Sequence, residues 1–122
     1  MTTRTVLIAD DEPSLRLLVV ATLDGYRVVE AKDGKEALRL LALERPALAI
    51  LDVSMPGHTG LELTSAIRRI PALANIAVIL LTSKARPADI QAGVDAGADL
   101  YITKPFSPLE LLNAVEQVLR PV

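Results

Sequence analysis

Residues 5–11 of the chain read TVLIADD, and this stretch decides how the rest of the sequence is interpreted. A short apolar run ends in two acidic side chains, Asp10 and Asp11. Later strand-like runs end in the same way: LAILD closes with Asp52, AVILLT closes with Thr82, and LYIT is followed by Lys104. Short continuous apolar runs of this kind are typical of strands that are buried on both faces of a parallel sheet.

The strand-like runs alternate with longer segments of helical character, which is typical of repeated βα units. The sequence therefore predicts an α/β fold, a flavodoxin-like, doubly wound (βα)5 domain with helices on both faces of the sheet. We expect strands at residues 5–9, 27–31, 48–52, 77–81 and 100–103. The strand order 2-1-3-4-5 would place strands one and three side by side at the switch point, where ligands bind.

Local signals mark where the helices begin and end. Three starts pair a capping residue with a glutamate three positions later. These pairs are Asp33 with Glu36, Thr59 with Glu62, and Ser107 with Glu110. Pro108 occupies a first helical position, Pro46 and Pro71 end the second and third helices, and Gly25 and Gly97 supply turns.

Size and composition favour one compact unit. The chain has 122 residues, of which 51% are hydrophobic, and this is enough for a core without disulfides. We found no internal linker, repeat beyond the βα alternation, or low-complexity tract. We therefore expect a single domain at residues 1–122.

Charge and cysteine content limit the partners and the compartment. Thirteen basic residues against 15 acidic ones give a net charge of -2, so we expect no direct contact with nucleic acid. The chain has no cysteine, which excludes disulfides and thiolate metal sites. The sequence contains no signal peptide pattern and no stretch long enough to insert into a membrane, so we expect a cytoplasmic protein.

The acidic residues at the strand ends favour a metal site. Crowded carboxylates repel one another unless a cation lies among them, and oxygen ligands without nearby histidine or cysteine favour Mg²⁺, for which Mn²⁺ could substitute. We expect Asp11 and Asp52 to bind the metal directly and Asp10 to act through a water. The backbone carbonyl of Ser54 would complete the protein ligands.

The same edge of the sheet carries groups suited to phosphoryl chemistry. Asp52 is the candidate nucleophile, because a carboxylate can accept a phosphoryl group as an acyl phosphate. Lys104 and the metal would neutralise the phosphoryl oxygens, and Thr82 could donate a hydrogen bond to one of them. Since no other acid, base or leaving-group site is apparent, the pattern indicates a domain that receives a phosphoryl group.

Four motifs resemble those of response regulator receiver domains. They are VLIADDEP at residues 6–13, LDVSMPG at residues 51–57 with Gly60, LTS at residues 81–83, and GADLYITKPF at residues 97–106. The resemblance covers essentially the whole chain in the right order. Each motif alone is a weak signal, but the four together are specific.

The resemblance implies phosphotransfer to Asp52 from the phosphohistidine of a histidine kinase, from a histidine phosphotransfer protein, or from a small donor such as acetyl phosphate. Such a domain is not an enzyme, and it catalyses only its own phosphorylation and dephosphorylation. Thr82 and Tyr101 would act as switch residues that reshape the face made by the fourth helix, the fifth strand and the fifth helix, where a downstream protein effector would bind. The family also has a cis peptide at the position of Lys104 and Pro105.

The first helix departs from the family pattern. The region between Asp11 and Gly25 is about two residues shorter than usual, so that either the helix or its connection to the second strand is shortened. The helix is also apolar nearly all round. Our hypothesis is that Leu17, Val20 and Ala21 form part of a partner surface or of a homodimer interface.

Several of these residues have a purely structural alternative. Asp10 and Asp11 could cap the first helix, Thr82 could be an ordinary strand-end residue, and Tyr101 could be a core side chain. Ser54 and Lys84 occupy positions that in the family tune how fast the phosphoryl group is lost, although Lys84 could be a plain surface lysine. We expect His58 to be a solvated loop residue rather than a phosphohistidine or a metal ligand.

Three other classes of protein compete with this interpretation. A receiver-like module could serve as a binding scaffold without phosphorylation, but such a module has no reason to keep every acidic, hydroxyl and ammonium group. A small flavodoxin-like enzyme or flavin carrier would need a phosphate-binding loop after the first strand, where this chain has acids. A haloacid-dehalogenase-type phosphatase would need an Asp-x-Asp pattern and cap insertions, which are missing.

Overall fold

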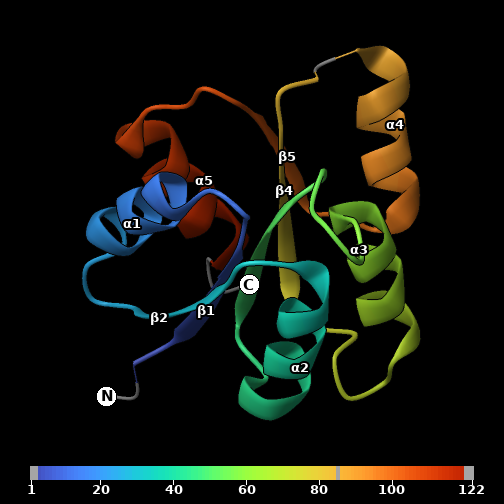
Figure 1. Ribbon diagram of the computed structural model, residues 1–122, viewed down its shortest axis with the longest axis horizontal. Coiled ribbons are helices and arrows are strands. Elements are labelled where there is room, and N and C mark those ends of the chain that lie inside the picture. The colour runs from blue at the N-terminus through green and yellow to red at the C-terminus, as the bar shows by residue number, and fades with distance from the viewer. Residues whose placement is uncertain (1–2, 85, 120–122) are drawn as a thin grey trace.

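The computed structural model describes residues 3–84 and 86–119. Within them, five parallel strands form one sheet in the order β2-β1-β3-β4-β5, with helices on both faces (Figure 1), as predicted. The elements are β1 (Thr5–Ala9), α1 (Pro13–Thr22), β2 (Arg27–Ala31), α2 (Gly34–Glu44), β3 (Leu48–Asp52), α3 (Gly60–Arg69), β4 (Ala77–Thr82), α4 (Pro87–Ala96), β5 (Leu100–Thr103) and α5 (Pro108–Leu119). The predicted domain at 1–122 extends past these residues at both ends.

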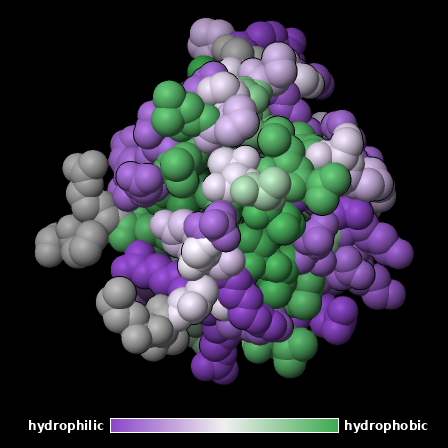
Figure 2. Space-filling view, turned by 90° about the vertical axis from the view of Figure 1, so that its left-hand side faces the viewer, coloured by the Kyte–Doolittle hydropathy of each residue, from purple (hydrophilic) through white to green (hydrophobic). Residues whose placement is uncertain are grey.

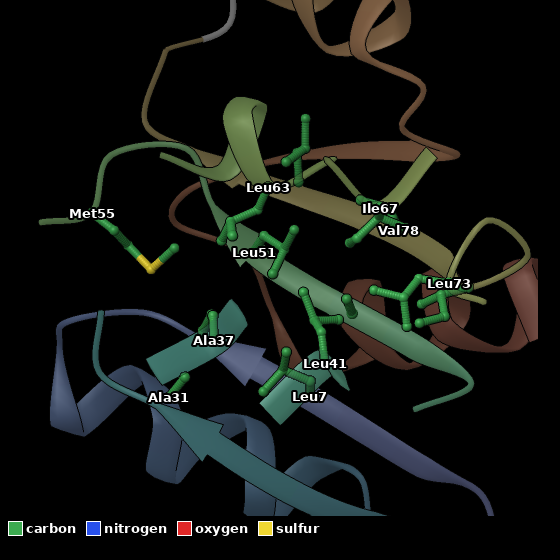
Figure 3. Close-up of a cluster of buried hydrophobic side chains, with 14 residues drawn as sticks. Leu7, Ala31, Ala37, Leu41, Leu51, Met55, Leu63, Ile67, Leu73 and Val78 are labelled. Atoms are coloured by element: carbon green, nitrogen blue, oxygen red, sulfur yellow. The ribbon is translucent and has the colours of Figure 1, made fainter. Parts of the chain in front are cut away.

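The sheet is buried on both faces because alternate side chains of each central strand enter different hydrophobic clusters. On β1, Leu7 and Ala9 pack into the cluster that α2 and α3 cover, which Figure 3 shows. Val6 and Ile8 pack into the cluster that α1 and α5 cover. Since successive strand residues point to opposite faces, an uninterrupted apolar run is what such a strand requires.

The predicted helix starts are confirmed. The Asp33 carboxylate accepts a hydrogen bond of 2.8 Å from the backbone N–H of Glu36. Thr59 and Glu62 form a reciprocal capping box before α3, and Ser107 and Glu110 form another before α5. Each cap satisfies backbone N–H groups that the helix itself leaves unpaired.

Two close backbone contacts hold the loop after β3. Gly34 begins α2, its N–H donates to the carbonyl of Pro56 at 3.0 Å, and a Cβ at this position would overlap the backbone of His58. Gly60 begins α3, and a Cβ there would lie 2.5 Å from the carbonyl oxygen of Asp52. Glycine is required at both positions because the chains pass too close for a side chain. The end of β3 is therefore packed from two sides.

The first helix and its connection are both short. α1 spans ten residues, and Leu23, Asp24, Gly25 and Tyr26 then form one turn in which the N–H of Tyr26 donates to the carbonyl of Leu23 at 3.1 Å. Gly25 has a φ of 96°, a left-handed conformation that glycine adopts without strain. No helix of the described part of the chain is long and apolar enough to cross a membrane.

Candidate functional site

The polar residues at the strand ends lie at one edge of the sheet. The carboxylates of Asp10, Asp11 and Asp52 each offer an oxygen within 4.8 Å of the others. Lys104 reaches this group from the loop after β5, and the peptide bond between Lys104 and Pro105 is cis. Parallel strands place their carboxyl ends together, so residues far apart in the sequence meet here.

Asp10 is fully buried, and both its backbone and its carboxylate are hydrogen-bonded. Its backbone N–H donates to the carbonyl of Ala31 on β2 at 3.0 Å. Its Oδ1 accepts from the backbone N–H of Glu12 at 2.9 Å, and its Oδ2 accepts from Nζ of Lys104 at 2.9 Å. The orientation of the Asp10 carboxylate is therefore fixed by contacts with backbone and ammonium groups.

Asp52 is a buried carboxyl with a perturbed pKa. Its Oδ1 accepts from the backbone N–H of Ser54 at 3.2 Å, and its Oδ2 lies 3.4 Å from Nζ of Lys104. Burial raises the pKa of Asp52 above its ordinary value, and the charge of Asp10 raises it further. The ammonium of Lys104 and the N–H of Ser54 offset this only in part. Ionised Asp52 is thus less stable in the metal-free protein than an ionised aspartate in water.

Lys104 is the cation that neutralises the acidic group. Its Nζ lies 2.9 Å from Asp10, 3.4 Å from Asp52 and 3.6 Å from Glu12, and only 16% of its side chain is exposed. Burial alone would lower the pKa of Lys104, but the hydrogen bond and charge of Asp10, together with Asp52, outweigh burial and raise it. Lys104 is therefore charged across the physiological range.

Thr82 and Tyr101 are connected through one residue of the loop after β4. The Thr82 hydroxyl oxygen, which is nearly buried, accepts from the backbone N–H of Lys84 at 3.1 Å. The Tyr101 hydroxyl donates to the carbonyl of Lys84 at 2.8 Å. The Tyr101 ring is half-buried and packs against Gly93 of α4. A movement of Thr82 would therefore shift the backbone of Lys84 and, through it, the hydrogen bond of the Tyr101 hydroxyl.

The remaining candidate residues are exposed and lie around the acidic site. Ser54 and Lys84 have exposed side chains, and the backbone N–H of Ser54 contacts Asp52. His58 is exposed in the loop after β3. It does not belong to the one cluster of potential metal ligands that residues 3–84 and 86–119 contain.

Two residues of this site escaped the sequence analysis. Glu12 contacts Lys104, and the guanidinium of Arg16 donates to the backbone carbonyl of Asp10 at 2.8 Å. The acidic run that includes Glu12 could have drawn attention to it. Nothing in the sequence marks Arg16, because its partner at the acidic site is a backbone atom.

The donor set fits a hard divalent cation. Three carboxylates within 4.8 Å of one another carry more negative charge than the single ammonium of Lys104 neutralises, and burial already disfavours ionised Asp52. A divalent cation would remove this cost, and carboxylate oxygens are the ligands that Mg²⁺ and Mn²⁺ prefer.

Replacing Asp52 with asparagine is expected to stabilise the metal-free protein at pH 7 by about 1 kcal/mol, or a few degrees in melting temperature. Because folding raises the pKa of Asp52, the folded state keeps that proton to a higher pH than the unfolded state. Stability is therefore lost as the pH rises through the raised pKa. The advantage of the variant should shrink towards pH 4 and disappear below the ordinary aspartate pKa of about 3.9.

Thermal unfolding in EDTA, followed by circular dichroism at pH 7 and pH 4, measures this difference. Asp24→Asn, in the exposed turn after α1, is the matched control and should melt like the wild type at both pH values. A variant Asp52→Asn that is no more stable than the wild type at pH 7 would contradict the proposed cost of charge at this position.

An open cleft of about 600 Å³ borders the acidic site on its α1 side. Apolar side chains from α1 and from the loop after β5 line it, together with polar groups from the ends of β1 and β4. Its lining residues are Glu12, Ser14, Leu15, Leu18, Ser83, Lys104, Pro105 and Phe106. Figure 2 views this side of the molecule and shows apolar surface gathered on it. On α1 itself, 69% of Leu17 and 36% of Val20 are exposed, and Ala21 is exposed too.

Comparison with known families gives a match to nearly the whole chain. The family model described as "Response regulator receiver domain" matches residues 6–116. The phosphate regulon transcriptional regulatory protein PhoB of Pseudomonas aeruginosa is 38% identical over 122 residues, which cover 98% of this chain and 53% of that protein. The chain spans about half the length of most curated relatives that it matches.

Relatives of similar length match as well. An uncharacterised 14.6 kDa protein of Leptolyngbya boryana is 41% identical over 114 residues, covering 92% of this chain and 87% of that one. Among solved structures, the chemotaxis response regulator CheY4 of Vibrio cholerae is 38% identical with a TM-score of 0.91, and the match covers 97% of this chain and 100% of that chain.

Proposed function

This chain belongs to the response regulator receiver domain family of two-component systems, and on that basis we propose that it accepts a phosphoryl group on Asp52. The donor would be the phosphohistidine of a histidine kinase or histidine phosphotransfer protein, or a small phosphodonor. Receiver domains are signalling domains rather than classical enzymes, and the only reactions we assign are phosphorylation and dephosphorylation of the domain itself. The observation that carries the proposal is the buried Asp52, between Lys104 at 3.4 Å and two further carboxylates.

The contacts of Asp52 suit it to nucleophilic attack. One carboxylate oxygen would form a bond to phosphorus while the bond from phosphorus to the donor breaks, which gives an acyl phosphate. The N–H of Ser54 holds the other carboxylate oxygen in place. The ammonium of Lys104 lies close enough to neutralise charge that appears on the phosphoryl oxygens.

Asp10, Asp11, Asp52 and the backbone carbonyl of Ser54 would hold Mg²⁺, or Mn²⁺ in its place. When bound, the metal supplies positive charge next to the oxygens of the transferred group. The protein supplies the rest. Asp10 is buried and held by Glu12 and Lys104, so that the site keeps its shape without being reorganised.

We further propose that Thr82 and Tyr101 transmit the state of Asp52. In the unphosphorylated protein the Thr82 hydroxyl oxygen accepts a hydrogen bond from the backbone N–H of Lys84. A phosphoryl oxygen would accept a hydrogen bond from the Thr82 hydroxyl. A shift of Thr82 towards that oxygen would break the bond from the Lys84 N–H, release the Lys84 peptide and remove the acceptor of the Tyr101 hydroxyl. Phosphorylation would then shift a population between two arrangements of this loop.

The output would be a protein contact on the face made by α4, β5 and α5, where Tyr101 lies. Exposed apolar residues on this face support the assignment: 40% of Ile90, 59% of Val94 and 65% of Leu109 are exposed. We assign no direct nucleic-acid contact and no membrane insertion to this chain, and we place it in the cytoplasm.

The phosphodonor is proposed to approach on the other side of Asp52. The cleft beside α1 opens next to Lys104, and the exposed Leu17, Val20 and Ala21 extend its apolar surface. A helix of the donor protein seated there would bring a histidine close to Asp52. The same surface could serve a homodimer, which a solution mass at high concentration would detect.

Incubation with acetyl phosphate, followed by the intact mass of the protein, tests the proposal. The wild type should gain one phosphoryl group with Mg²⁺ and none with EDTA, while Asp52→Asn should gain none in either buffer. Asp24→Asn should behave like the wild type. No gain by the wild type under conditions in which another receiver domain reacts would contradict phosphoacceptor function and favour a binding scaffold.

A further inference from the structure

We propose that Arg16 is a positioning residue for the metal site: its guanidinium fixes the peptide between Asp10 and Asp11 and thereby directs the Asp11 carboxylate. This inference rests on the proposed function, since it concerns the same acidic site. Arg16 itself would touch neither metal nor phosphoryl group.

Arg16 joins three elements next to the acidic residues. It belongs to α1, and its side chain turns back towards the end of β1, where Nη1 donates to the carbonyl of Asp10 at 2.8 Å. Its Nε donates to Glu30 on β2 at 3.2 Å, and only 17% of its side chain is exposed. The guanidinium is planar and its donors have a fixed geometry, so contacts with two partners leave it little freedom.

Asp11 is the carboxylate that needs such support. The side chain of Asp10 has two partners of its own, Glu12 and Lys104. The side chain of Asp11 is exposed, and within residues 3–84 and 86–119 its carboxylate takes part in no hydrogen bond or ion pair. Its direction therefore depends on the backbone that carries it.

The contact with the Asp10 carbonyl controls that backbone. The carbonyl of Asp10 and the N–H of Asp11 belong to one planar peptide unit, so fixing the carbonyl fixes the plane. The N–H of Asp10 is already held by Ala31 on β2. Together, Ala31 and Arg16 hold the chain on both sides of Asp10 and leave Asp11 aimed at Asp10 and Asp52.

Electrostatics alone makes the opposite prediction. A guanidinium so close to the site repels a divalent cation, so removing its charge would strengthen metal binding if charge were its only effect. If Arg16 acts by positioning, removing it weakens binding. Loss of a group that orients a metal ligand typically costs about 10- to 100-fold in affinity. The sign of the change therefore distinguishes the two roles.

The test is a titration of the metal-free protein with Mn²⁺, in which electron paramagnetic resonance measures the free ion. We expect Arg16→Met to bind Mn²⁺ about tenfold more weakly than the wild type, or weaker still. The Mn²⁺ affinity of Arg16→Lys should lie between those of Arg16→Met and the wild type, because one ammonium cannot reproduce both hydrogen bonds of the guanidinium. The matched control is Arg27→Met, whose bidentate pair with Glu44 joins β2 to α2, and it should bind like the wild type.

Circular dichroism and melting temperatures in EDTA show whether each variant is folded. Unchanged or tighter Mn²⁺ binding by folded Arg16→Met overturns the inference. If Arg16→Met does not fold, Arg16→Lys decides in its place. An Arg16→Lys variant that binds Mn²⁺ as tightly as the wild type also overturns the inference. Failure of the wild type itself to bind Mn²⁺ better than Asp11→Asn would overturn the metal site of the proposed function, which is a separate result.

Discussion

Replacing Lys104 with methionine is expected to tighten Mg²⁺ binding about tenfold and to slow the phosphorylation of Asp52 by acetyl phosphate about 100-fold. The two effects have opposite signs because Lys104 has two roles. In the metal-free protein its ammonium lies 2.9 Å from Asp10 and 3.4 Å from Asp52, where it neutralises the carboxylates that a metal would bind. During transfer, the same ammonium would stabilise the phosphoryl oxygens.

The variant should also be less stable than the wild type when no metal is present. Without Lys104, the fully buried Asp10 loses its charged partner, and an uncompensated buried charge is costly. Added Mg²⁺ should restore part of this loss, so the increase in melting temperature on adding Mg²⁺ should be larger than in the wild type.

Isothermal titration calorimetry with Mg²⁺ and intact mass measured over time give the two quantities separately. Lys35→Met, which removes an exposed lysine at the start of α2, is the matched control for the loss of one positive charge. Weaker Mg²⁺ binding by Lys104→Met would contradict the view that ammonium and metal compete for the same carboxylates. An unchanged phosphorylation rate would contradict its role in transfer.

Replacing Arg68 with methionine is expected to destabilise the fold by about 3 kcal/mol without changing Mg²⁺ affinity. Arg68 stands in α3, and its guanidinium donates to the carbonyls of Gly97, Ala74 and Ile76 at 2.9, 2.9 and 2.6 Å. It also pairs with Asp99 at 2.9 Å, and the same Asp99 oxygen accepts from a backbone N–H of β4 at 2.8 Å.

One guanidinium thus satisfies backbone acceptors in the loops that lead into β4 and β5. Methionine keeps much of the apolar stem but donates nothing, so partly buried carbonyls lose their partner. The effect is confined to stability because these loops enter the sheet at the edge opposite to the carboxyl ends of the strands, where Asp52 lies.

Urea unfolding followed by circular dichroism measures the difference. Arg69→Met is a closely matched control, because Arg69 is the next residue and is exposed. Among residues 3–84 and 86–119, its guanidinium donates only to the Ser65 carbonyl of its own helix, at 3.3 Å. We expect Arg69→Met to lower the free energy of unfolding by less than about 0.5 kcal/mol. Similar losses in both variants would show that the network around Arg68 contributes little.

Much of the fold could be predicted because its signals are local. The runs 5–9 and 48–52 are apolar without a break, which is what a strand buried on both faces requires, and the caps at Asp33 and Thr59 mark helix starts through residues three positions away. The open question about the first helix needed the structure, since a ten-residue helix followed by one turn cannot be told from a frayed helix in the sequence.

The sequence by itself determined the strands, and it placed Asp10, Asp11, Asp52, Thr82 and Lys104 at strand ends, which lie together at one edge of a parallel sheet. The strand order 2-1-3-4-5 was predicted from the flavodoxin-like pattern, because other doubly wound orders also satisfy apolar periodicity and caps.

Only the tertiary structure decided how these groups are held. The ammonium of Lys104 meets Asp10 across 94 positions of the chain. Arg16 and Arg68 act on backbone carbonyls, which every residue has and no sequence pattern marks. Contacts of this kind depend on where folded segments pass each other, and the direction of each carboxylate depends on those contacts.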